Sequence, residues 1–167
     1  MAEGGARFVD PGTTLTDLAH DVLVRCPRCD ARATVRNEAV LDGQRSGAFQ
    51  GLHAPHRLAC GACAHVSRWF GGKGSSMVFG EPVDPWLRLP LWLAAPHGSH
   101  TVWAYNEAHL ALLEAFVASS LRVHGTGMGD HPTHQTVIGR LPAWWKDPHA
   151  RDALGRVLRR LRASLGD

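Results

Sequence analysis

The chain has 167 residues, of which 44% are hydrophobic and 20% are charged, and its formal net charge is +3. This composition supports a folded core and excludes disorder throughout, and the length suits one compact domain or a small metal module joined to a larger core. No stretch reaches the roughly 18 apolar residues of a membrane span, and the first eleven residues lack the apolar segment of a secretory signal, so we expect no membrane contact.

Taken in chain order, residues 1–19 are predicted to be a lead-in segment, loose up to Gly12 and with a helical turn over 14–20. Strands are predicted over 22–24 and 31–36, and again over 57–60 and 65–70. Between these two pairs, glycines punctuate residues 37–57, which indicates a loop-rich insertion with room for one more strand. The two halves of residues 20–70 therefore form a pseudo-repeat, in which each half is a hairpin.

Each predicted hairpin carries a CxxC pair at its turn, Cys26 with Cys29 and Cys60 with Cys63. Two thiolates spaced in this way reach one ion from a single turn, so two such turns supply the tetrahedral sulfur set that zinc prefers. Four thiolates leave no open coordination position, which predicts one structural Zn²⁺; a redox site is the weaker alternative, because the βαβ context is missing. Metal-spaced thiols suit a reducing compartment, so a cytoplasmic location is expected.

Through Cys26-Pro-Arg-Cys29 and Cys60-Gly-Ala-Cys63, the first seventy residues resemble a zinc ribbon of the rubredoxin-like kind. The remainder resembles bacterial proteins of unassigned function, in which such a ribbon precedes segments like Leu89-Pro-Leu-Trp-Leu93, Trp103-Ala-Tyr-Asn106 and Leu141-Pro-Ala-Trp144. The resemblance implies metal binding and, as in zinc ribbons generally, hairpins that contact nucleic acid or protein.

Residues 71–83 form a glycine- and serine-rich link, in which glycine follows Lys73 where a Walker phosphate loop requires serine or threonine. Residues 84–167 are predicted to form a β-hairpin over 87–94 and 101–105, in which Pro90 confines the first strand to an edge or a bulge. A helix is expected from a cap at Asn106 to near Gly125. The last helix begins at Asp147 and Pro148 and carries an arginine-bearing face opposite its leucines.

Further polar residues could mark chemistry, but each also has a simpler explanation. His131 and His134 belong to a glycine-bearing loop, which is a poor scaffold for a second metal, and we expect a solvated ring for His109 on its helix. Glu107 and Glu114 share one helix face, which is weak support for acid–base catalysis. The aromatic group is predicted to be core, with a base-stacking surface as the alternative; it comprises Trp92, Trp103, Tyr105, Trp144 and Trp145.

Together these patterns predict an α+β protein with an N-terminal zinc ribbon over 20–70, followed by a β-hairpin and two to three helices packed on it. The expected function is that of a non-enzymatic binding or accessory module that contacts protein or nucleic acid. The proposed contact lies on the last helix, although a solvated face is the alternative; its residues are Arg156, Arg159, Arg160 and Arg162. The alternative function is an enzyme whose site lies between the ribbon and the helical part and uses histidines such as His109 or His131.

Overall fold

The computed structural model describes residues 7–38, 48–71, 75–119, 121–123 and 133–166 of this α+β protein. The chain forms two compact units. The ribbon unit comprises residues 16–94 and 103–106, and the helical unit comprises residues 1–15, 95–102 and 107–167. In the described part of the chain, no helix has the length and apolar character that crossing a bilayer requires.

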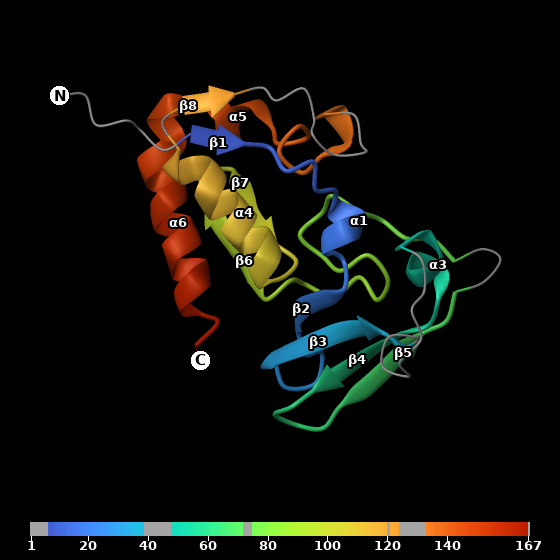
Figure 1. Ribbon diagram of the computed structural model, residues 1–167. Coiled ribbons are helices and arrows are strands. Elements are labelled where there is room, and N and C mark those ends of the chain that lie inside the picture. Colours follow the sequence, from blue (N-terminus) through green and yellow to red (C-terminus); the bar gives the residue numbers. More distant parts are fainter. Residues whose placement is uncertain (1–6, 39–47, 72–74, 120, 124–132, 167) are drawn as a thin grey trace. The chain divides into compact units, whose positions relative to one another are not determined.

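A four-stranded antiparallel sheet forms the centre of the ribbon unit (Figure 1). Its strands lie in sequence order: β2 (Asp21–Arg25), β3 (Arg32–Asn37), β4 (His56–Cys60) and β5 (Val66–Trp69). Every second residue of the first three strands is buried, as the alternation of apolar and polar side chains dictates. The two predicted hairpins are thereby confirmed, and the sheet has one buried face built on Val22, Val24, Val35 and Leu58.

The insertion between the two hairpins contains a short helix, α3 (Ala48–His53), where the sequence left room for a strand. Residues 39–47 lie outside the described part of the chain. The insertion begins and ends at one place, because the backbone N–H of Glu38 donates to the carbonyl of Pro55 at 2.8 Å. The side-chain amide of Asn37 donates to the carbonyl of Gly51 at 2.6 Å and ties α3 to the sheet.

The second hairpin region differs from its predicted limits. Strands β6 (Leu93–His97) and β7 (His100–Ala104) pair through a turn at Gly98, whose φ of 58° suits glycine. The first strand starts after Pro90 instead of at residue 87, because Arg88 has a φ of 59° and proline cannot donate to a ladder. Short helix α1 (Leu15–Leu18) precedes β2, close to the predicted helical turn.

The helical unit packs α4 (Glu107–Ala118) against α6 (Arg151–Ala163) (Figure 1). Short elements complete it: η1 (Thr133–Gln135), α5 (Ala143–Lys146) and η2 (Pro148–Ala150). The carboxylate of Asp147 accepts from the N–H of His149, as a cap requires, with Pro148 at the first position. This cap begins the 3-10 turn η2, and α6 itself begins at Arg151 instead of at the predicted Pro148. The buried residues that α4 and α6 contribute are Leu110, Leu113, Phe116, Val117, Leu154, Val157, Leu158 and Leu161.

One pairing in the helical unit was not predicted. Helix α4 ends at Ala118 rather than near Gly125, and the chain then forms β8 (Leu121–Val123). This strand pairs in parallel with β1 (Arg7–Val9), which lies in the segment expected to be loose. The ring of Phe8 fixes β1 by meeting the ring of Phe116 edge to face at 5.5 Å.

Candidate metal centre

The register of the sheet brings the two CxxC turns to the same end. We call residues 26–31 the first knuckle and residues 60–65 the second knuckle. The first knuckle joins β2 to β3 and the second joins β4 to β5. Because β3 and β4 are antiparallel, with Ala33 opposite Cys60, the start of one strand lies beside the end of the other. The thirty-residue gap between the CxxC pairs is therefore absorbed at the opposite end of the sheet, where Asn37 pairs with His56.

The two knuckles have the same backbone geometry. In the first, the N–H of Cys26 donates to the carbonyl of Ala31 at 2.9 Å, and in the second the N–H of Cys60 donates to the carbonyl of His65 at 3.0 Å. The residue after the last cysteine of each knuckle is left-handed, with φ of 60° at Asp30 and 57° at Ala64. The predicted pseudo-repeat is thus present at the level of individual hydrogen bonds.

The four sulfur atoms form one compact cluster. All four Sγ atoms lie within 4.8 Å of one another, and the Cys26–Cys63 and Cys29–Cys60 pairs are each 3.7 Å apart. A Zn–S bond of about 2.3 Å and tetrahedral angles require sulfurs roughly 3.8 Å apart. The observed separations therefore fit a single ion. An iron–sulfur cluster would place additional atoms between the thiolates and would require a wider arrangement.

The four cysteines are free thiols that differ in solvent exposure. Cys26, which follows β2, and Cys60, which ends β4, are buried, whereas Cys29 is exposed and Cys63 is half-buried. The short Sγ–Sγ distances join the first cysteine of one knuckle to the second cysteine of the other, as expected for two equivalent turns related by an approximate two-fold axis. Such a closed four-thiolate set would hold zinc as a cross-link and would leave no coordination position for a substrate.

Hydrogen bonds from backbone N–H groups shift the pKa values of two of the thiols. The N–H of Cys63, followed by that of Ala62, lowers the pKa of the Cys60 thiol to about 7. The N–H of Ala31 also acts to lower the pKa of Cys29, but hydrogen bonds with the other three thiols, together with burial, raise it to about 12. Thiols that share protons in this way must release them to bind a metal, so occupancy of this centre should be pH-dependent.

The free edge of β2 is covered by residues that follow the ribbon in sequence. The N–H of Arg25 donates to the carbonyl of Pro90 at 2.9 Å, and the N–H of Trp92 donates to the carbonyl of Leu23 at the same distance. The guanidinium of Arg25 also lies over the ring of Trp92, 5.1 Å from its centroid. A sheet edge that is satisfied in this way holds the first knuckle in register.

Residues that sequence reasoning missed support the insertion end of the sheet. Trp86 is 3% exposed; its ring stacks on that of His56 at 3.6 Å, and its Nε1 donates to the carbonyl of Leu52 in α3. The carboxylate of the buried Asp84 accepts from the backbone N–H groups of Trp86, Leu87 and Leu89. The Asp84-Pro85 dipeptide is a turn signal that could have located this support.

Burial shifts two titrating groups at this end in opposite directions. Desolvation raises the pKa of Asp84, although its three N–H donors act against the shift. Desolvation lowers the pKa of His56 to about 4, although its contact with the carbonyl of Ala54 favours the charged form. A neutral imidazole stacked on indole is therefore part of the ribbon unit's core.

The histidines that were considered for catalysis are not brought together in the described residues. The expectation of a solvated His109 was wrong: its ring is 2% exposed, and burial lowers its pKa to about 4. His134 lies on η1 and is exposed, and His131 lies outside the described residues. Glu107 and Glu114 are both paired with Arg162, at 2.7 and 2.6 Å, so they connect α4 to α6.

The predicted arginines lie on the last helix, whereas Trp92 precedes β6 instead of lying within a strand. Arg156, Arg159 and Arg160 are on α6 and are exposed. Tyr105 and Trp145 are buried, as predicted for core. The other three rings of that aromatic group, Trp92, Trp103 and Trp144, are half-buried.

Comparison of the chain with protein-family models, with curated proteins and with solved structures gave no match. What the structure supports is therefore the four-cysteine cluster on an antiparallel sheet, which is consistent with a metal site of four thiolates.

Proposed function

We propose that this protein is a non-enzymatic binding or accessory module of the zinc-ribbon type. One structural Zn²⁺, bound by Cys26, Cys29, Cys60 and Cys63, fixes the two hairpins at one end of the sheet. The observation that carries the proposal is the mutual spacing of the four Sγ atoms, all within 4.8 Å. The metal supplies a cross-link between two turns that are far apart in sequence, and the four thiolates exclude a reactive ligand.

The proposed partner is an anionic surface of a protein or a nucleic acid, contacted through the arginines of α6. Three of these, Arg156, Arg159 and Arg160, are exposed. None of the three forms an ion pair with a carboxylate among the residues that the structure describes. Arg162 is part of the predicted set as well, but its charge is offset by two glutamates of the same unit.

Elemental analysis combined with native mass spectrometry tests the metal part of the proposal. We expect one zinc per chain in the purified protein, and loss of that zinc in Cys60→Ser but not in Ala59→Ser, which places the same hydroxyl at an exposed neighbouring position. A folded chain that holds no metal, or one that holds iron with a rubredoxin-like visible spectrum, would contradict it.

Affinity capture from lysate with and without nuclease tests the partner part. A partner retained at stoichiometric yield after nuclease treatment indicates protein contact, and one lost by the treatment indicates nucleic acid. Capture of neither, with the zinc-loaded chain as bait, would overturn the assignment as a binding module.

A further inference from the structure

A groove in the helical unit collects positive charge without any acidic residue in its lining. It has a volume of about 710 Å³ and lies between α6 and the tip of the β6–β7 hairpin. Helix α6 contributes Ala153, Arg156, Val157, Arg159, Arg160 and Ala163, and the hairpin contributes Pro96, His97 and Gly98. All of these residues belong to the helical unit.

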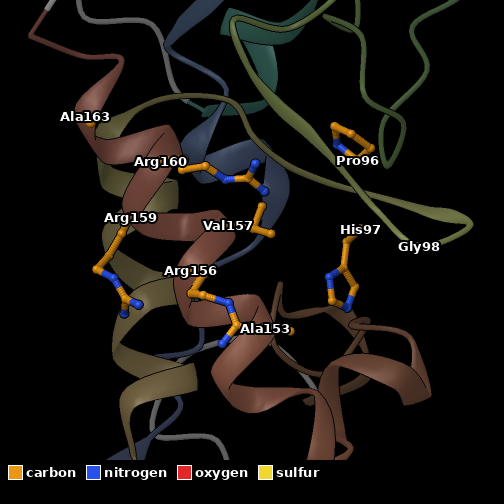
Figure 2. A pocket seen from close by; sticks show the side chains of 9 residues that line it. All are labelled: Pro96, His97, Gly98, Ala153, Arg156, Val157, Arg159, Arg160 and Ala163. Atoms are coloured by element: carbon orange, nitrogen blue, oxygen red, sulfur yellow. The ribbon is translucent and has the colours of Figure 1, made fainter.

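The arginines of α6 extend from different sides of the helix (Figure 2). Arg156 and Arg160 are four positions apart, so they lie on one side of the helix, and Figure 2 shows Val157 and Arg160 on the side that faces the hairpin with His97. Arg159 extends from the opposite side, where its Nη1 lies over Gly155. Two guanidinium groups thus border one apolar floor, which Val157 forms with 4% of its surface exposed.

One neighbouring arginine, Arg162, is neutralised within the fold, whereas Arg156 and Arg160 form no ion pair in the part of the chain that the structure describes. Arg162 forms ion pairs with Glu107 and Glu114. A second groove of about 550 Å³, which Arg156 also borders, combines Arg151 and Arg159 with Glu114 and Asp152. Like charges four positions apart on a helix repel each other in the free protein. An anionic ligand would remove this repulsion.

The aromatic ring that lines the groove, that of His97, belongs to a cluster of flat rings on the hairpin side. The ring of His97 lies 5.5 Å from that of Trp144 with an interplanar angle of 23°, and the ring of the exposed His100 stacks on Trp144 at 4.6 Å and 3°. A planar base can extend such a stack, whereas an acidic peptide offers phosphate-like charge without a planar face. A duplex keeps its bases paired and stacked inside, so this combination favours a single strand.

Resting on the proposal that the chain is a binding module, we infer that this groove binds single-stranded nucleic acid. Phosphates contact Arg156 and Arg160, and a base stacks on the imidazoles of the hairpin tip. Guanidinium groups bind phosphate oxygens in bidentate fashion, and aromatic stacking tolerates any base, so we expect binding without strong sequence preference.

Fluorescence anisotropy with the zinc-loaded full chain tests the inference, with a short labelled single strand, the matching duplex and a labelled poly-glutamate peptide as probes. We expect the single strand to bind most tightly. We expect Arg156→Gln with Arg160→Gln to weaken it about tenfold or more, and to lower the slope of log K against log salt by about 1.4. The matched control is Arg7→Gln with Arg140→Gln, which removes the same charge from exposed positions of the same unit and should leave affinity and slope near wild type.

A separate variant tests the proposed stacking of a base on the imidazoles. His100→Ala should lower single-strand affinity about tenfold with an unchanged salt slope, because an uncharged stacking contact releases no counterions. Equal losses in the two double variants, preference for duplex, or tighter binding of poly-glutamate would each overturn the inference. Because all variants keep the four cysteines, their zinc content should stay at one per chain. Loss of the groove assignment is therefore distinguishable from loss of the proposed metal module.

Discussion

The ribbon unit and the helical unit bring distant segments together by different means. In the ribbon unit, two hairpins separated by a long insertion meet at a cluster of four Sγ atoms, and the other end of the sheet is closed by Trp86 stacked on His56. In the helical unit, α4 and α6 meet through leucines and through Arg162, which contacts two glutamates. The first arrangement is suited to a metal ion held by four thiolates, and the second rests on apolar packing.

This difference predicts which perturbation should unfold each unit. A small sheet with one buried face contributes limited apolar burial, and metal binding to small four-cysteine sites is coupled to folding. Two helices that pack leucine, valine and phenylalanine side chains into a shared core need no ligand. Each unit should therefore respond to its own perturbation.

The largest expected effect is the removal of zinc. In Cys60→Ser, or after treatment with a strong chelator, we expect amides of β2 to β5 to lose hydrogen-exchange protection while those of α4 and α6 keep theirs. The reason is that a structural zinc site supplies a contribution on the order of 10 kcal/mol to folding, which the ribbon sheet cannot replace. Exchange mass spectrometry measures both units in one sample, and Ala59→Ser is the control. Unchanged protection of the ribbon strands in zinc-free protein would remove the distinction between the units.

The ribbon was the predictable unit because its signals are local. Each CxxC pair lies between two short strands, and alternation of side chains marks those strands without knowledge of the rest of the fold. The sequence also predicted the cap at Asp147 and the leucine stripe of α6. What it could not predict is the pairing of β1 with β8, since three-residue strands more than a hundred positions apart carry no shared pattern.

Long-range partners explain the other misses. The sequence placed Glu107 and Glu114 on one helix face, as weak support for acid–base catalysis, but it did not show that Arg162, far along the chain, pairs with both. The burial of His109 depends on what packs over α4, which a single helical pattern does not show. The groove at α6 likewise required the hairpin tip, whose His97 is nearly sixty residues before Arg156.

A second effect separates the two ends of the ribbon. A Cβ at Gly71 would clash with the backbone carbonyl oxygen of His53, so Gly71→Ala must displace backbone at the insertion end. We expect it to lower the free energy of unfolding by about 1–3 kcal/mol in urea titrations with zinc present, as overpacking does. Gly61→Ala, in the second knuckle, has nothing within 4 Å of the added Cβ and should stay within about 0.5 kcal/mol of wild type. A reversed order would contradict the described packing of that end.

Acid should weaken the helical unit without involving zinc. Burial lowers the pKa of His109 from 6.5 to about 4, so between these pH values the unfolded chain binds the proton and the folded chain does not. The stability from neutral His109 is therefore complete above pH 6.5 and is lost as the pH falls toward 4, at up to about 1.4 kcal/mol per pH unit. Hydrogen exchange of the α4 and α6 amides should show this loss of stability with falling pH in the wild type. The control His134→Gln, which alters an exposed ring, should show the same loss, whereas His109→Gln should show a smaller one. Equal slopes in all three would show that another group controls the acid response.

The smallest expected effect tests the equivalence of the knuckles. Ala64 has a φ of 57°, where its Cβ crowds the following carbonyl, so Ala64→Gly should relieve strain. Glycine also gains freedom in the unfolded chain, which leaves a net increase in stability of about 0.5–1 kcal/mol in urea titrations with zinc bound. Ala62→Gly, in the same knuckle but without a positive φ, should have the opposite sign because only the unfolded-state term remains.

The corresponding change in the first knuckle, Asp30→Gly, should stabilise less than Ala64→Gly. Aspartate tolerates the left-handed region better than alanine, and its carboxylate lies 3.1 Å from Nη1 of Arg25. That ion pair is exposed and contributes little, so the sign should remain positive. If Ala64→Gly and Ala62→Gly changed stability in the same direction, the left-handed residue after each CxxC pair would not be the strained position, and the two knuckles would not share one backbone design.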